Sequence, residues 1–195
     1  AVAQNGLALQ WASQELQSNE LIVEAAVGQQ GQALRFAAEE LRAARDIVLQ
    51  AVQMDGLALA HASETLRQDA DVALRAVQQN GHALQWVAQS LLFSLDYGWQ
   101  IIEQALLQDS KALQHVPLVR RGFDEVALAV RSDAAAMEWA PQATKDDLDC
   151  MLGLIAISAC VFPYASDERR QSPAFAADVV RSLFEQVAAG DGRPL

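Results

Sequence analysis

The sequence predicts an all-α protein: an α-solenoid of short paired helices, about 25 residues per repeat, with a C-terminal helical cap. The first observation is a strict repeat, since Ala-Val pairs begin at positions 1, 26, 51 and 76 and glycines follow at 6, 31, 56 and 81. The second is the helical spacing of apolar residues within each repeat. The third is that β-structure would need period-two alternation and β-branched runs, and neither occurs.

Each repeat is expected to form two short helices. The first covers about Leu7 to Gln17, and its apolar face is Ala8, Leu9, Ala12 and Leu16. The second covers Asn19 to Gln30, with Asn19 as its N-cap. Gly31 is expected to end this helix in the left-handed conformation that glycine adopts without a Cβ penalty.

Small residues recur where the helices must approach one another closely. They are Ala8, Ala12, Ala33, Ala37, Ala58, Ala62 and Ala83, with Val87 as the exception. A helix of roughly ten residues is marginal alone. Stability is therefore expected to come from contacts between neighbouring repeats.

The later repeats are degenerate. An insertion within Leu92–Trp99 delays the next unit by four residues, about one helical turn, and we expect it to lengthen a helix. Ser110 and Ala134 replace the repeat glycine in the last two copies. The predicted repeat array therefore covers residues 1–145, with units starting near 1, 26, 51, 76, 105 and 129.

Residues 146–195 are expected to form C-terminal capping helices. An apolar helix is predicted from Asp146 to about Phe162, ended by Pro163 and opened by a capping box of Thr144 and Asp147. A polar loop, Ser166 to Pro173, should follow it. The last predicted helix, Ala174 to Ala189, has an apolar face of Phe175, Val179, Leu183, Phe184 and Val187.

Charge and cysteine usage limit the class of partner and the compartment. A net charge of −11 argues against binding to nucleic acid or to an anionic lipid surface, and it permits a cationic partner. Cys150 and Cys160 are expected to be buried free thiols in a reducing intracellular compartment. The chain opens in the middle of a repeat, either because a leader has been removed or because more repeats lie upstream.

One column of residues recurs ten positions after each unit start, and it is the candidate interaction site. It comprises Trp11, Phe36, His61, Trp86, His115 and Trp139. The column either packs between repeats, which we favour, or lines a groove for a peptide or a flat ligand such as a pigment. His61 and His115 then substitute for aromatic rings and are not expected to bind metal, and His82, at a variable position, is expected to be exposed.

The run from Cys150 to Ser166 carries no charge and is just at the lower length limit for a membrane span. We expect a buried helix that caps the last repeat, with insertion into a membrane or a hydrophobic partner through Cys150–Tyr164 as the alternative. A search for catalytic motifs finds no phosphate loop, nucleophile elbow, HExxH or CxxC. We therefore predict no enzyme activity and no catalytic, cofactor-binding or metal-binding residue.

The unit AVxQNGxALQWASxEL, followed by a charged cap and an IVLxAV helix, resembles the tandem helical repeat family DUF4116, a domain of unknown function. The resemblance covers Ala1 to about Leu91 closely and weakens from Leu92. It implies tandem arrays of a domain about two units long, found largely in algal, protist and some bacterial proteins. The family has no assigned activity, so no functional residue can be transferred. With the arginine-biased composition, the resemblance points to an algal protein and to a plastid location.

The predicted function is a non-catalytic scaffold that mediates protein–protein interaction. The alternative is an accessory structural subunit of a membrane complex, for example a photosynthetic complex of the plastid. Such a subunit would contact its complex through the repeat surface or the apolar 150–164 helix.

Overall fold

The computed structural model describes residues 4–188, and the regular secondary structure in this range is helical, with no strand. This confirms the all-α class. The chain divides into two compact units, Ala1–Val116 (the N unit) and Pro117–Leu195 (the C unit). This division falls earlier than the predicted boundary between array and cap at 145/146.

Each complete repeat of the N unit contains three helices rather than the predicted two: a six-residue 3-10 helix, a four-residue α-helix and an α-helix of ten or eleven residues. They are η1 (Gly6–Trp11), α1 (Gln14–Gln17) and α2 (Glu20–Gln29); η2 (Gly31–Phe36), α3 (Glu39–Arg42) and α4 (Arg45–Met54); η3 (Gly56–His61), α5 (Glu64–Arg67) and α6 (Ala70–Gln79); η4 (Gly81–Trp86), α7 (Gln89–Leu92) and α8 (Gly98–Gln108); and η5 (Ser110–His115).

Hydrogen bonds between repeats explain why the predicted helix over Leu7–Gln17 is wrong. The residues after each 3-10 helix are extended, and one of them donates its N–H to a carbonyl of the preceding repeat. These bonds run from Ala38 to Gln17 (3.0 Å), from Ser63 to Arg42 (2.9 Å) and from Ala88 to Arg67 (3.0 Å). An uninterrupted helix would bond these N–H groups internally. Pro117 occupies the same position in the next unit and has no N–H to donate, and the N unit ends just before it.

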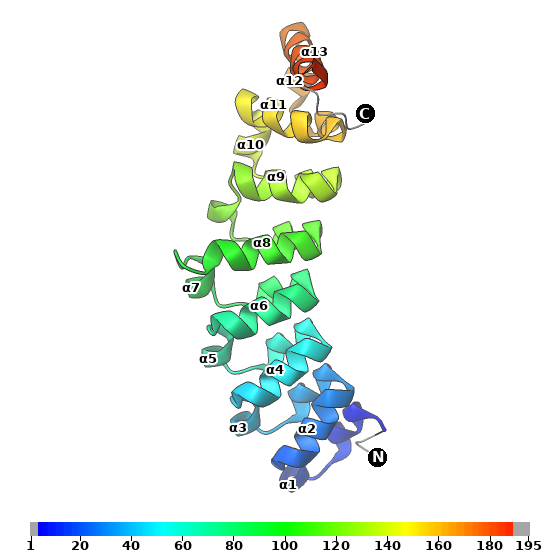
Figure 1. Ribbon diagram of the computed structural model, residues 1–195, viewed down its shortest axis with the longest axis vertical. Helices are drawn as coiled ribbons and strands as arrows, with labels where there is room; N and C mark the ends of the chain where they lie inside the picture. The colour runs from blue at the N-terminus through cyan, green and yellow to red at the C-terminus, as the bar shows by residue number, and fades with distance from the viewer. Residues whose placement is uncertain (1–3, 189–195) are drawn as a thin grey trace. The chain divides into compact units, whose positions relative to one another are not determined.

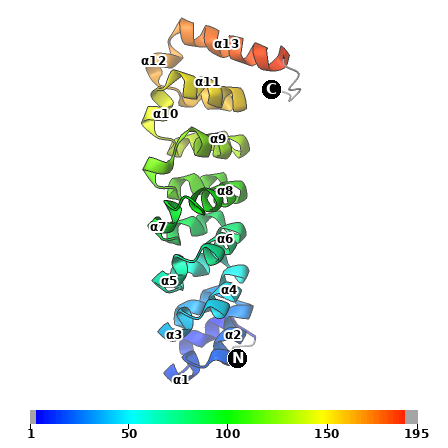
Figure 2. The same cartoon turned by 60° about the vertical axis from the view of Figure 1, so that its left-hand side comes forward.

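The long helices α2, α4, α6 and α8 lie side by side in chain order (Figure 1). The short helices α1, α3, α5 and α7 follow one another along one edge of the N unit in both views (Figure 1, Figure 2). The core of the N unit includes aliphatic residues from the long helices and, among the buried residues of the 3-10 helices, one leucine from each. These leucines are Leu9, Leu34, Leu59, Leu84 and Leu113, each at most 1% exposed.

The repeat glycines allow close backbone packing and do not adopt a left-handed conformation, so the prediction for Gly31 is wrong. Gly31 begins η2, and the extended residue before it, Gln30, ends α2. A Cβ on Gly31 would overlap with the carbonyl oxygen of Ala51 in the next repeat, and one on Gly56 with that of Ala76. Glycine, which has no Cβ, therefore allows the backbones of neighbouring repeats to come this close.

The insertion forms a turn instead of lengthening a helix. Phe93 to Tyr97 connect α7 to α8, and α8 has eleven residues where the other long helices of the N unit have ten. The inserted residues therefore expose side chains that a longer helix would bury.

The C unit repeats the same plan. Its elements are η6 (Leu118–Arg120), α9 (Phe123–Ser132), η7 (Ala134–Trp139), α10 (Gln142–Asp146), α11 (Leu148–Ile157), η8 (Ala159–Tyr164), α12 (Asp167–Arg170) and α13 (Pro173–Ala188). The helices α11, η8, α12 and α13 each begin 25 residues after α9, η7, α10 and α11, respectively.

The predicted helix from Asp146 to Phe162 is therefore wrong. The α11 helix ends at Ile157, Ser158 is extended, and Pro163 lies inside η8. Val161 takes the buried place that Ala136 occupies in η7, because the 3-10 helix of each repeat contributes to the core. The predicted polar loop, Ser166 to Pro173, contains α12.

The final helix lies close to its predicted range, and Ala189 falls outside the described residues. Phe175 and Val179 are buried, whereas Phe184 is 71% exposed, so the predicted apolar face is too wide. Leu183 is half-buried, and the side chain of Val187 is outside the described part.

The start of α11 is capped by Asp147 itself. Its carboxylate accepts the backbone N–H of Cys150 at 2.8 Å, and this bond lowers the pKa of Asp147. Thr144 is buried within α10, so the predicted capping box does not form. Cys150 and Cys160 are both free, and Cys160 is exposed, contrary to the expectation of buried thiols.

Candidate interaction surfaces

The predicted column lies at the surface of the repeats. Trp11 is 83% exposed and Trp86 38%. Phe36, His61, His115 and Trp139 are half-buried. The column is thus partly packed and partly accessible, and its role in binding stays a prediction.

Side chains from successive repeats meet beside this column. The Gln32 side chain begins one such group: its Nε2 donates to Asp55 Oδ2 at 2.7 Å, and its Oε1 lies 3.1 Å from Nε2 of His61. Gln32 comes from η2, whereas Asp55 and His61 come from the following repeat. A polar side chain at the second position of one 3-10 helix therefore reaches the column residue of the next.

The same group recurs two repeats later with histidine in place of glutamine. His82 Nε2 lies 3.2 Å from Asp109 Oδ2, and its Nδ1 lies 3.0 Å from Nε2 of His115. The two imidazole rings are nearly perpendicular, with centroids 5.2 Å apart. His82 is half-buried between these partners, which corrects the prediction that it is exposed.

Two arginine side chains lie near His61 in the group that it forms with Gln32 and Asp55. Burial lowers the pKa of His61, and the nearby Arg35 and Arg42 guanidinium groups lower it further, while Asp55 raises it. The Arg35 guanidinium also lies over the Phe36 ring, 4.4 Å from its centroid. His61 therefore stays neutral down to a lower pH than a solvated histidine does.

The inserted turn between α7 and α8 exposes four large apolar side chains. Leu95 is 98% exposed, and Phe93, Tyr97 and Trp99 are each between 39% and 46% exposed. Large apolar groups gathered on one short segment are typical of interaction surfaces. We call Phe93–Trp99 the apolar turn.

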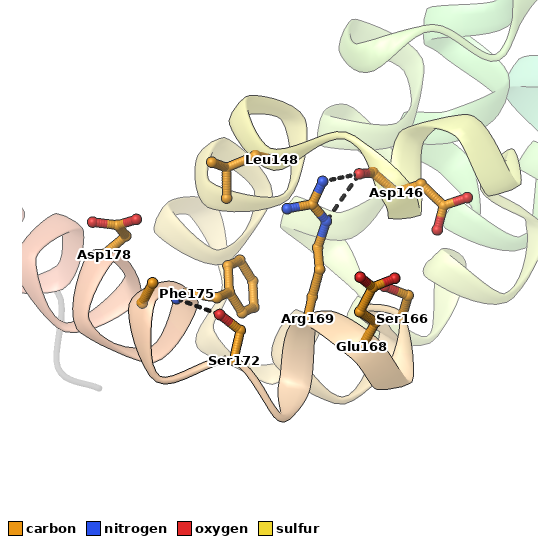
Figure 3. A pocket seen from close by; sticks show the side chains of 9 residues that line it. Asp146, Leu148, Ser166, Glu168, Arg169, Ser172, Phe175 and Asp178 are labelled. Carbon is orange, nitrogen blue, oxygen red and sulfur yellow. Dashed lines mark hydrogen bonds between the residues drawn. The ribbon is translucent and has the colours of Figure 1, made fainter.

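Open hollows occur among the described residues of both units, and two are considered in turn. The larger, about 460 Å³, lies in the C unit and is lined by Asp146, Leu148, Ser166, Glu168, Arg169, Ser172, Ala174, Phe175 and Asp178. Figure 3 shows Arg169 extending from α12 to the backbone carbonyl of Asp146, to which it donates through Nε and a terminal nitrogen. The smaller, about 300 Å³, lies in the N unit beside Leu7, Gln32 and Asp55.

Two kinds of feature are missing from residues 4–188. No helix in this range is long and apolar enough to cross a membrane. The range also contains no group of three or more His, Cys, Asp or Glu side chains that could hold a metal ion.

These features define an all-helical protein whose neighbouring repeats are joined by hydrogen bonds of side chains and of the backbone. The family model described as "Domain of unknown function (DUF4116)" matches residues 1–42 and 45–92. The resemblance predicted from the N-terminal repeats is thereby confirmed over this part of the chain. No curated protein and no solved structure matches the sequence.

Proposed function

We propose that the protein is a non-catalytic α-solenoid scaffold that binds other proteins, in a reducing compartment of the cell. The packing of α2, α4, α6 and α8 supports a solenoid, because each long helix contacts the next along the chain. Fully buried leucines fill the interior of each N-unit repeat, which leaves the outer surface for contacts with partners.

The apolar turn is the observation that favours protein binding most. Phe93, Leu95 and Trp99 expose apolar surface at the insertion that delays the fifth unit by four residues. Exposed apolar side chains are costly in water unless a partner covers them. The insertion is therefore best explained as a contact for a protein with an apolar surface of its own.

The alternative, an accessory subunit of a membrane complex, relied partly on an unbroken apolar helix over 150–164. That segment is divided between α11 and η8, so this helix is not present as a docking element. The scaffold proposal needs no such helix, and we prefer it.

The test is capture of partners from the native cells with three forms of the full chain: wild type, Leu95→Asp and the control Gln53→Asp. Gln53 is an exposed residue of α4, outside the apolar turn. Quantitative mass spectrometry should show one set of proteins enriched by wild type and by Gln53→Asp and lost with Leu95→Asp. Equal thermal melting of the three forms excludes misfolding as the cause. The same proteins captured by all three forms would contradict the proposed contact.

A further inference from the structure

His82 and His115 come from different repeats, yet their ring nitrogens meet. His82 Nδ1 and His115 Nε2 are 3.0 Å apart, and Asp109 binds the other nitrogen of His82 at 3.2 Å. The side chains of His82 and Asp109 are each about one third exposed, at 32% and 34%, so solvent reaches the pair.

This separation allows both nitrogens to bind one metal ion. With metal–nitrogen bonds of about 2.05 Å, two donors 3.0 Å apart subtend an angle of about 94° at the ion. That angle is close to the right angle between neighbouring ligands of a tetragonal ion and well below the tetrahedral value. Imidazole ligands in tetragonal geometry suit Cu²⁺ and Ni²⁺.

Asp109 supplies the support that a metal-binding histidine usually has. A ligating imidazole commonly donates its other N–H to a carboxylate, which fixes the ring and its tautomer. Asp109 Oδ2 lies 3.2 Å from Nε2 of His82, within reach of this role, and a proton on Nε2 leaves Nδ1 of His82 as a donor of electrons to an ion. Without an ion the two nitrogens form a hydrogen bond, so one of them carries a proton. When an ion binds, both nitrogens must be deprotonated, and the His115 ring then carries its proton on Nδ1.

We propose that His82 Nδ1 and His115 Nε2 bind a divalent ion of the Cu²⁺ or Ni²⁺ type, with Asp109 positioning His82. Since the described residues offer no third protein ligand, water fills the remaining positions. The site is independent of the scaffold proposal, because the apolar turn takes no part in it.

The polar group one pair of repeats earlier provides a matched control within the same chain. Gln32, Asp55 and His61 occupy the places of His82, Asp109 and His115, but an amide replaces the first imidazole. This group has one imidazole and is not expected to chelate an ion. The Arg35 and Arg42 guanidinium groups near His61 also disfavour a cation at this group.

The test is titration calorimetry of the full chain with Ni²⁺ at about pH 7.5, a pH at which imidazoles are mostly neutral. Wild type should bind one ion. His82→Gln and His115→Gln should each bind at least about tenfold more weakly, and Asp109→Asn about 10–100-fold more weakly. His61→Gln should bind like wild type.

Side-chain NMR provides a second readout, because the sequence contains three histidines. Substoichiometric Ni²⁺, which is paramagnetic, should broaden the ring signals of His82 and His115 and spare those of His61. Equal broadening of all three rings would overturn the proposal. Unchanged affinity in His82→Gln or in His115→Gln would overturn it as well.

Discussion

His61 shows, at the scale of one residue, how the preceding repeat influences the hydrogen bonding and the protonation of a ring at the edge of a repeat. Gln32 binds its Nε2, and Arg35 and Arg42 disfavour its protonated form. Asp55 acts in the opposite direction but does not outweigh burial and the two arginines. The ring therefore functions as a neutral hydrogen-bonding group in the folded protein.

This environment predicts a dependence of stability on pH. The pKa of His61 is lowered below 6.5 in the folded chain, so the unfolded chain binds the proton at a higher pH. The contribution of His61 to the free energy of unfolding is therefore present above pH 6.5. It is lost progressively as the pH falls toward the folded pKa.

The measurement compares urea midpoints of wild type and His61→Gln at about pH 7.5 and about pH 5.5. Wild type should lose more stability between the two values, because glutamine does not titrate. Every other titratable group is common to the two forms and cancels in the comparison. Parallel losses in the two forms would mean that the His61 pKa is the same folded and unfolded.

Ala58 tests the packing of small residues at the same scale. Its side chain is completely buried in η3. Ala58→Leu should overpack the N unit and lower the free energy of unfolding by about 1–3 kcal/mol. A urea midpoint equal to that of wild type would show that the neighbouring helices can move apart.

At the scale of the element, Gly56 in η3 and Gly28 in α2 have opposite roles. Gly56→Ala should destabilise the N unit by at least about 1–3 kcal/mol, because its Cβ meets the backbone carbonyl of Ala76. Gly28 lies inside α2, and the nearest atom to its Cβ would be the flexible Gln50 amide nitrogen. Gly28→Ala should therefore stabilise the N unit by about 0.5–1 kcal/mol. Thermal melting of the two variants measures both effects, and shifts of the same sign would contradict this account.

The long helices were predictable because their signals are local. Asn19 and Asp69 cap α2 and α6 as their sequence positions indicate, with bonds to the N–H groups of Ile22 and Val72. The split before α1 was not predictable. It depends on bonds such as that from Ser63 to Arg42, which join residues of different repeats.

The final repeat is hard to recognise in the sequence because several of its repeat residues are replaced. Leu154 and Ile155 replace the Ala-Val pair, and Ser158 replaces the acidic or amide residue before the 3-10 helix. Tyr164 nevertheless stands 25 residues after Trp139, and this aromatic spacing is the signal that would have found the repeat. Apolar composition alone favoured one long helix instead.

The candidate site was only partly predictable. The column was visible from its spacing, but its partners lie one repeat earlier, at a position that varies between leucine, glutamine, histidine and lysine. His82 therefore looked like an ordinary variable surface residue. If the variable position of each repeat is compared with the column residue of the next repeat, His82 falls opposite His115.

At the scale of the whole molecule, the net charge of −11 predicts a response to salt. Like charges repel within a compact chain, and ions screen that repulsion over a Debye length of about 10 Å at 0.1 M. The melting temperature should rise between about 20 mM and about 500 mM NaCl. A melting temperature that falls with NaCl would instead mean that ion pairs such as Arg45–Asp69 outweigh the repulsion.

The two polar groups, that of Gln32 with His61 and that of His82 with His115, lie two repeats apart. This spacing has a consequence for how such a chain can lengthen or shorten. His61 and His115 each stand after a repeat that offers a polar partner, whereas Trp86 stands after one that offers Leu57. Removal of the repeat that contributes Gln32 would set His61 against Leu7, and removal of the repeat that contributes His82 would set His115 against Leu57. Loss of two adjacent internal repeats keeps a polar partner before each remaining histidine of the column, so two repeats are the smallest change in size that leaves this pattern intact.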